Sequence, residues 1–528
     1  MTKNKTKKIW LVAYLTVVFA VLTSFPLYRN RESDNPYVSF LLAAFIWFLI
    51  LACFLVVIKP VRKAISEKLA AFEERFDKIS SFQLFLISWG FISLCWILPY
   101  LALFPGTLGY DSPLQLCQYL GTMEMTDHHP VAHTVLLGSV INLGRSLFGS
   151  YNAGVALFTA LQGLAVTSVL SYSIYEMRKR SVSLVFCILG ILWMAFNPFL
   201  QMLSFNCTKD ILFGVAFSYF VISFYDCLVS EDEDKKSRVR DMVFVGTFGI
   251  IMCLFRHQGV YIVAAVLVMA LFLKKRRKET LVCLGMVFVI YEVYSFGIHG
   301  IFGYEAVDKR EMLSVPMQQM AYVCKLKVDG ADMDISEDQF NRVLTFISED
   351  GILNYQPDSA DPVKSEFDTK AFLAEPGANI GTYLSIGIHN SKAYIEAFKN
   401  MVGPYIRTQD NNYLGLMALY TYTDQYTVDI ERNSKARNYY ENLLYNSVYM
   451  GYRDLPLASI LFYPGLCIWL LFAGFGVQVY NRSYAGVLVV VAMLLYFMSL
   501  LLGPTALVRY LYPLILLVPF MVVLVFDT

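Results

Sequence analysis

Long apolar stretches recur along most of the chain, and they constrain its fold more than any other feature of the sequence. Each has about 15 to 24 residues, which is about what an α-helix needs to cross roughly 30 Å of hydrocarbon at about 1.5 Å per residue. Only 16% of the 528 residues are charged, whereas soluble domains carry about 25%. The sequence therefore excludes an ordinary soluble globular protein and a disordered chain, and it predicts an all-α polytopic membrane protein.

Twelve of these stretches are predicted to span the membrane. The first follows a run of lysines between residues 3 and 8. Because it lacks a small-x-small cleavage site and another apolar stretch follows at once, we interpret it as an uncleaved anchor. The predicted spans cover residues 9–27, 38–58, 82–104, 152–174, 182–199, 210–229, 241–255, 258–273, 280–300, 456–479, 484–503 and 506–526.

Lysine and arginine are distributed asymmetrically over the connections between these spans. With the N-terminus in the cytoplasm, the strongly basic connections all lie on the cytoplasmic side, as the positive-inside rule requires. They are residues 59–81, 175–181, 230–240, 274–279 and the turn at Arg482. This agreement requires that the apolar stretch 131–148 does not cross, so we predict that it lies at the outer interface. Both termini are then cytoplasmic.

One long hydrophilic region interrupts the spans. Residues 303–455 face outward in this topology, and about 150 residues are enough for one compact domain, which we expect to be mainly α or α+β. The single Cys324 of this region excludes an internal disulfide framework, and the absence of an Asn-x-Ser/Thr sequon favours a bacterial envelope. We therefore divide the chain into nine spans (1–302) with an outer loop at 105–150, an extracytoplasmic domain (303–455) and three C-terminal spans (456–528).

Ionisable and polar residues gather in four turns that this topology places on the outer side. They are Tyr110, Asp111, His128, His129, Lys209, Asp210, Arg256, His257 and Arg509. The span 241–255 reaches only about 22 Å from the inner surface, so Arg256 and His257 are predicted to lie below the outer headgroups. A cation at that depth needs an anion or a polar cavity, and the anion that resides there is a lipid phosphate.

The cytoplasmic connections carry no site for a soluble nucleotide donor. None exceeds about 25 residues, and none has a Gly-rich phosphate loop, so an activated substrate is expected to arrive through the membrane. Transfer of a sugar from a polyprenyl phosphate to a hydroxyl needs a carboxylate that accepts the proton and cations that stabilise the departing phosphate. Asp111 is the candidate base, and the candidate phosphate-binding cations are Lys209, Arg256 and Arg509.

The outer-loop motifs resemble those of a known enzyme superfamily. The sequence Gly-Tyr-Asp-Ser at 109–112, followed by His-His-Pro at 128–130 and an apolar stretch, is similar to the GT-C superfamily of polyprenyl-phosphate-dependent glycosyltransferases. It is more similar to a poorly characterised bacterial multispanning group assigned to that superfamily. The resemblance covers mainly residues 100–270 and 508–513. It implies a GT-C-like fold with Asp111 as catalytic base, although many members have Asp-Glu where this chain has Asp111-Ser112.

Each charged residue also has a purely structural interpretation. Asp111 could cap a helix that begins at the next residue, and Lys209 could form only a local ion pair with Asp210. Arg256 and Arg509 could extend to the membrane interface as ordinary anchors. These alternatives predict different contacts for the same side chains.

The predicted function is that of a membrane glycosyltransferase at the outer face of a bacterial plasma membrane. Its expected partners are a polyprenyl-phosphate-linked sugar, an envelope glycan, lipid or protein that accepts the sugar, and membrane lipids, with no nucleic acid. Tyr110, His128, His129, Asp210 and His257 are predicted to support the substrate or the loop. Metal dependence stays open at this point. A divalent cation would be held by Asp111, His128 and His129, because imidazole and carboxylate are normal ligands.

Two other functions fit the predicted topology. An O-antigen-type ligase or polymerase also has about twelve spans and a large late outer loop, but it depends on charged residues in that loop. A flippase or transporter of lipid-linked glycans needs ionisable residues deep in several spans, and Glu292 is the clearest example here.

Overall fold

The structure, a computed structural model, describes residues 2–27, 38, 40–53, 79–109, 111–230, 234–406, 430, 434–438 and 465–526. Tyr110, most of the predicted basic connection 59–81, and parts of the predicted spans 38–58 and 456–479 and of the predicted domain 303–455 lie outside these ranges. All regular elements within the described ranges are helices, accompanied only by isolated β-bridges. The predicted all-α class is therefore confirmed for the part of the chain that the structure describes.

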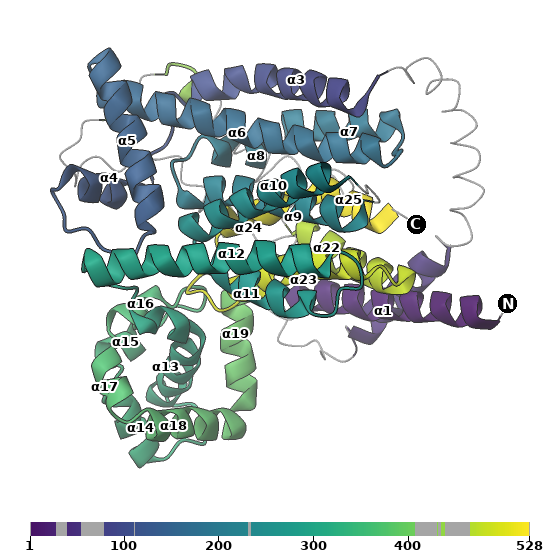
Figure 1. Ribbon diagram of the computed structural model, residues 1–528. Helices are drawn as coiled ribbons and strands as arrows, with labels where there is room; N and C mark the ends of the chain where they lie inside the picture. Colours follow the sequence, from purple (N-terminus) through teal and green to yellow (C-terminus); the bar gives the residue numbers. More distant parts are fainter. Residues whose placement is uncertain are drawn as a thin grey trace.

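Apolar helices pack along one another in a bundle (Figure 1), together with helix Phe40–Cys53. They are α1 (Thr2–Leu27), α3 (Ser81–Ala102), α6 (Tyr151–Lys179), α7 (Leu184–Phe196), α8 (Pro198–Ser204), α9 (Lys209–Val229), α10 (Lys235–Phe255), α11 (Gln258–Ala270), α12 (Arg277–Phe296), α22 (Leu466–Asn481), α23 (Tyr484–Leu500), α24 (Val508–Leu516) and α25 (Val518–Phe526). A π-helical turn, η1 (Gly297–Ile301), continues α12. Two further helices, α4 (Ser112–Leu120) and α5 (Val131–Phe148), lie at one end of the bundle.

Five helices among the described residues are long and apolar enough to cross a membrane. They are α3, α5, α6, α9 and α12 with η1, and α24 and α25, bent by 50° at their junction, would make a sixth. The chain is therefore a multi-pass membrane protein. Six more apolar helices have 10–17 residues. The predicted number of twelve spans depends on these shorter helices and on α10, whose first turns are charged.

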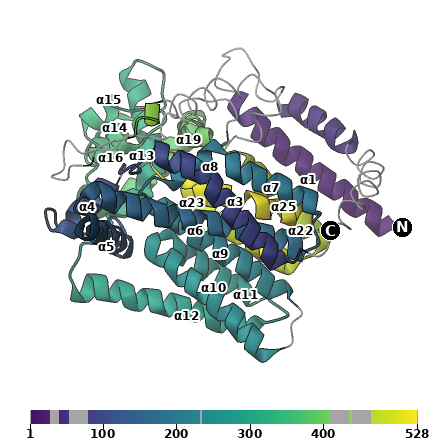
Figure 2. The same cartoon turned by 90° about the horizontal axis from the view of Figure 1, so that it is seen from above.

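The helix α5 runs crosswise to its neighbours. Figure 1 shows it across the direction of α3, α6 and α12, and Figure 2 shows it foreshortened. It meets α6 at the level of the backbone, because a Cβ atom at Gly144 would lie 2.5 Å from the Cα of Gly154. By length and composition α5 could cross a membrane, so its predicted place at the interface stays a prediction, which this direction supports.

The described part of the predicted outer domain is a separate group of helices below α11 and α12 in Figure 1. It comprises the 3-10 turn η2 (Lys309–Leu313), α13 (Ser314–Val328), α14 (Glu337–Leu344), α15 (Glu349–Leu353), α16 (Asp361–Ser365), α17 (Thr369–Ala374), α18 (Pro376–His389) and α19 (Ser391–Ile406). It has its own buried core, which includes Met320, Phe346 and Ile386. Backbone contact joins it to the bundle, since Ala360 N–H donates to the Pro504 carbonyl at 2.7 Å.

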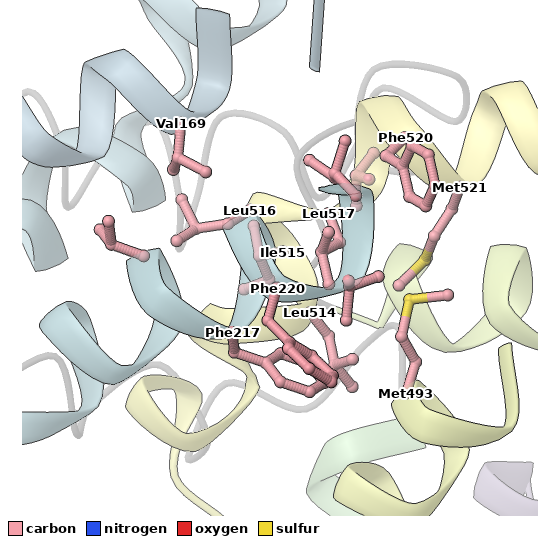
Figure 3. Close-up of a cluster of buried hydrophobic side chains, with 14 of the residues drawn as sticks. Val169, Phe217, Phe220, Met493, Leu514, Ile515, Leu516, Leu517, Phe520 and Met521 are labelled. Atoms are coloured by element: carbon pink, nitrogen blue, oxygen red, sulfur yellow. The ribbon is translucent and has the colours of Figure 1, made fainter. Parts of the chain in front are cut away.

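Side chains from the middle and the end of the chain meet in the core of the bundle. Figure 3 shows Phe217 and Phe220 of α9 close to residues 514–517 of the α24 region, with Val169 of α6 and Phe520 of α25 nearby. Helices in lipid associate through close van der Waals packing of this kind. The packing holds the first turn of α24 against the first turn of α9, where the candidate site lies.

Candidate active site

The turn that carries Asp111 is held against the start of α9 by hydrogen bonds. Cys207 N–H donates to the Thr107 carbonyl at 2.9 Å, and the Ser112 hydroxyl donates to the Cys207 carbonyl at 2.5 Å. These bonds join two segments that lie far apart in the sequence. As a result, Asp111 at the start of α4 lies beside Lys209 at the start of α9.

Three basic side chains surround the carboxylate of Asp111. Lys209 Nζ donates to Asp111 Oδ2 at 3.2 Å and to His129 Nδ1 at 3.0 Å. Arg509 Nη1 lies 3.5 Å from the same carboxylate oxygen. The side chain of Asp111 is 29% exposed, whereas that of Arg509 is 6% exposed. Asp111 therefore lies at the open, solvent-accessible end of this group.

Asp210 forms the deep end of the same group. Its side chain is fully buried, and Arg256 Nη1 lies 2.7 Å from its Oδ1 atom. Arg509 Nη1 lies 3.6 Å from its Oδ2 atom. Charges of opposite sign thus alternate from Arg256 through Asp210, Arg509 and Asp111 to Lys209. We call these five residues the charge chain.

Aromatic rings hold the two arginines in place. The Tyr510 ring centroid lies 4.8 Å from Arg509 Cζ and 5.1 Å from Arg256 Cζ. Arg256 Nη1 also donates to the Tyr496 hydroxyl at 3.1 Å. Such cation–π contacts add to the ion pairs when the cation is removed from water. The sequence analysis missed Tyr496, because a tyrosine inside an apolar span has no distinguishing local signal.

Burial and the neighbouring cations determine the charge states of Asp111 and His129 at the open end. Burial would raise the pKa of Asp111, but the nearby Lys209 and Arg509 outweigh it and hold this pKa below its usual range. Burial, together with Lys209, lowers the pKa of His129 to about 3. Near neutral pH, Asp111 is therefore a carboxylate, and His129 is a neutral imidazole that accepts a hydrogen bond from Lys209 at Nδ1.

The contacts in the structure are not those that the purely structural interpretations of these charged residues predict. Asp111 is at the N-cap position of α4, but its side chain makes no capping hydrogen bond. Lys209 pairs with Asp111, and Asp210 pairs with the two arginines. Arg256 and Arg509 turn into the protein instead of extending to an interface, since both are buried. The structure thus brings all three predicted cations and both predicted carboxylates together.

The histidines of the outer loop do not form a metal site. The ring centroids of His128 and His129 are 4.6 Å apart, but His129 Nδ1 faces the ammonium group of Lys209, which would repel a metal cation. Within the described ranges, no group of three or more His, Cys, Asp or Glu side chains could hold a metal ion. The suggested metal set of Asp111, His128 and His129 is therefore not supported. Tyr110 lies outside the described residues.

His257 belongs to a second cluster, which we call the Asp127 cluster (Asp127, His257, His299 and Tyr291). His257 Nε2 donates to the Asp127 carbonyl at 3.1 Å, and His257 Nδ1 lies 3.2 Å from the Tyr291 hydroxyl. His299 Nε2 lies 3.2 Å from Asp127 Oδ2. The sequence analysis missed His299. Its place at the outer end of the predicted span 280–300 was the signal that could have identified it.

Comparison with known proteins gives a family match. Residues 120–528 match the model of a family described as "Family of unknown function (DUF6020)". The chain belongs to the DUF6020 family. No curated protein and no solved structure matches it. The DUF6020 match includes His129, Lys209, Asp210, Arg256 and Arg509, and it begins just after the turn that carries the candidate base. It carries no link to the GT-C superfamily.

Proposed function

We propose that this DUF6020 protein is a membrane glycosyltransferase of the GT-C type that transfers a sugar from a polyprenyl phosphate to a hydroxyl at the outer membrane face. The observation that carries the proposal is the charge chain, which joins one accessible carboxylate to buried cations. An enzyme that transfers a group from a lipid phosphate needs this combination, because one end must accept a proton and the other must bind the leaving phosphate.

The proposed topology has twelve spans, with the helical unit 303–455 facing outward. The described part of each predicted span is mostly helical. The charge chain is built from the starts of α4, α9 and α24 and the end of α10, and the predicted topology places all four on the outer side. Charged groups from four separate turns could not meet in this way if their helix ends lay on opposite sides of a bilayer.

The proposed reaction uses Asp111 as the base. The acceptor oxygen forms a bond to the anomeric carbon of the sugar while the bond from that carbon to the phosphate oxygen breaks. The phosphate leaves with the bonding electron pair, and Asp111 takes the proton of the acceptor hydroxyl. Lys209 and Arg509 are the cations beside Asp111, so they are placed to stabilise the negative charge of the leaving phosphate.

The low pKa of Asp111 has a specific meaning in this reaction. Before the donor binds, Lys209 and Arg509 stabilise the carboxylate, and a carboxylate stabilised in this way is a weak base. A donor phosphate that enters beside Asp111 competes for the same two cations. Once they pair with the phosphate, the pKa of Asp111 rises towards its ordinary value, so the base becomes effective only when the donor is bound.

Arg256 has a different role in this proposal. It contacts Asp210 and not Asp111, and it is almost completely buried. It therefore acts behind the site, by neutralising Asp210 so that Arg509 can interact with Asp111 and the phosphate. With three cations and two carboxylates, the charge chain carries one net positive charge, which favours an anionic ligand.

The substitution Asp111→Asn tests this function. In a strain from which the gene is deleted, we expect the sugar composition or linkages of the envelope polymers to change. The intact gene should restore them, and the Asp111→Asn variant should not, although it reaches the membrane in equal amount. Asp332→Asn, at an exposed turn of the helical unit, is the matched control and should restore them fully. Restoration by the Asp111→Asn variant would refute the base assignment, and unchanged polymers in the deletion strain would refute the transferase.

A further inference from the structure

Both ring nitrogens of His299 face hydrogen-bond acceptors. His299 Nδ1 lies 3.0 Å from the carbonyl oxygen of Tyr304, and a carbonyl can only accept. His299 Nε2 lies 3.2 Å from the carboxylate oxygen Oδ2 of Asp127. A neutral imidazole carries one N–H group and can donate to only one of these two acceptors.

One additional proton removes this conflict. Either His299 is an imidazolium that donates to both oxygens, or Asp127 is a carboxylic acid that donates to His299 Nε2 while Nδ1–H donates to Tyr304. Both states contain the same number of protons. The neighbouring His257 needs no extra proton, because its Nε2–H donates to the Asp127 carbonyl and its Nδ1 accepts from the Tyr291 hydroxyl.

We propose that Asp127 and His299 share this additional proton, and that the pair is a proton-dependent clasp that positions the outer loop at the candidate active site. The inference rests on the proposed function only for its consequence in sugar transfer. His299 is a positioning residue, since it acts through Asp127 and touches none of the charge chain.

The clasp lies where four segments of the chain meet. Asp127 lies in the loop, two residues before His129, and its N–H donates to the Glu305 carbonyl at the entry to the helical unit at 2.9 Å. His257 follows Arg256 directly in the turn between α10 and α11, and His299 lies in η1 at the end of α12. Isolated π-helical turns of this kind are frequent at functional sites. The clasp therefore lies beside the hydrogen bond from His257 to the Asp127 carbonyl, which connects the loop that carries His129 with the turn that carries Arg256.

The other titratable groups around the pair do not account for a proton at this place. From the elements packed against it these are His257, Lys209, Tyr291, Tyr294 and Glu305. Among them only His257 has an ordinary pKa near neutrality, and burial lowers the pKa of His257, so it stays neutral. Burial also raises the pKa of Asp127, in agreement with a proton held close to this carboxylate.

The direction of the pH dependence follows from the proton count. Two acceptors that face one imidazole favour the additional proton in the folded pair, so under this proposal the pair keeps it to a higher pH than the separated groups of an unfolded chain. The clasp is therefore complete at low pH and is lost as the pH rises until the pair releases its proton. Above that pH the lone pair of His299 Nε2 faces an ionised carboxylate, and the loop separates from η1.

Asp127→Asn distinguishes this proposal from a simple ion pair. The Asn side chain keeps Oδ1 as the acceptor for Val131 N–H, 3.4 Å away in the wild type, and its amide N–H₂ group can donate to neutral His299 Nε2. This variant therefore satisfies the same hydrogen bonds without the additional proton. Asp127→Ala and His299→Ala remove the clasp at every pH.

Hydrogen–deuterium exchange of the peptide 121–130, in the full-length protein in nanodiscs, measures the clasp directly. At pH 6 we expect the wild type and the Asp127→Asn variant to be equally protected. At pH 9 the wild type should exchange about tenfold faster than the Asp127→Asn variant, because a hydrogen bond to a charged group contributes about this factor, and the comparison at one pH cancels intrinsic exchange. Both Ala variants should exchange at either pH as fast as the wild type does at pH 9.

Two results would overturn the proposal. If the Asp127→Asn variant followed the wild type at every pH, the pair would hold no additional proton. If it exchanged as fast as the Ala variants at pH 6, the carboxylate charge itself would be required. Thermal unfolding of each variant verifies that the peptide reports on a folded protein.

Failure of the proposed function can be distinguished from failure of the clasp proposal. The exchange experiment uses no substrate, so its result stands even if Asp111→Asn restores the envelope polymers. If the clasp positions the active site, the Asp127→Asn variant should retain sugar transfer at alkaline pH, where the wild type loses it. Equal transfer by both at alkaline pH, with the expected exchange result, would show that the clasp is real but does not position this site.

Discussion

Removal of the buried carboxylate of Asp210 tests whether the charge chain is a buried, mutually dependent network. In Asp210→Asn, Arg256 loses an ion pair of 2.7 Å and Arg509 loses one of 3.6 Å, while both guanidinium groups stay buried. Breaking a buried pair in this way destabilises proteins by about 3 to 5 kcal/mol. Arg256 keeps its bonds to Tyr496 and Gln258, so we expect the lower end, about 3 kcal/mol.

The matched control is an exposed ion pair of equal length. Lys327 Nζ and Glu337 Oε1 are also 2.7 Å apart, but the Glu337 side chain is 77% exposed. Glu337→Gln should therefore change stability by less than about 1 kcal/mol. The comparison separates the effect of burial from the effect of distance, since the two pairs differ in burial and not in length.

Thermal unfolding with a thiol-reactive fluorophore measures both variants, because the buried Cys207 and Cys253 react only when the bundle opens, and the buried Cys324 reacts only when the core of the helical unit that carries Glu337 opens. A loss of about 3 kcal/mol corresponds to a fall in the midpoint of roughly 3 to 6 °C, since the shift per kcal/mol decreases with chain length. Equal midpoints for Asp210→Asn and Glu337→Gln would refute the reasoning, because Asp210 would then contribute no more than a surface carboxylate.

Two further predictions test the contact between α5 and α6 and the membrane topology. Gly154→Ala would place a Cβ atom against the backbone carbonyl of Ile141 and should destabilise the protein by about 1 to 3 kcal/mol, whereas Gly285→Ala, with no atom within 4 Å, should not destabilise it in the same unfolding assay. In a Cys53→Ser background, Glu124→Cys should react with a membrane-impermeant thiol reagent on intact cells, and Lys275→Cys only after lysis. Reaction of both in intact cells would contradict the proposed sidedness.

The helices could be predicted closely from the sequence, because an apolar run bounded by polar residues has few alternatives in a membrane. The predicted spans 82–104 and 210–229 agree with α3 and α9 to within about two residues at each end. The sequence alone could not settle which of these helices cross the membrane. The apolar stretch of α5 has the composition of a span, and its crosswise direction depends on packing against α6 that no local pattern encodes.

The members of the site were easier to predict than their pairing. Loop charges and span lengths placed Asp111, Lys209 and Arg509 on one side of the bundle, and the structure brings them into contact. Sequence adjacency suggested that Lys209 pairs with Asp210. The two side chains point to different partners instead, since consecutive residues of a helix are about 100° apart around its axis. The pairing therefore depends on how α4, α9 and α24 pack.

Asp210 is the second carboxylate of the charge chain. The outer loop has Asp111-Ser112 and so contains one carboxylate at this point. In this structure the second carboxylate comes from the first turn of α9 and is fully buried between two arginines. A carboxylate in that position cannot exchange protons with a substrate at the open end, but it neutralises one of the two arginines. Its removal should therefore strengthen binding of an anion at Asp111 while weakening the fold, and both effects have the same electrostatic origin.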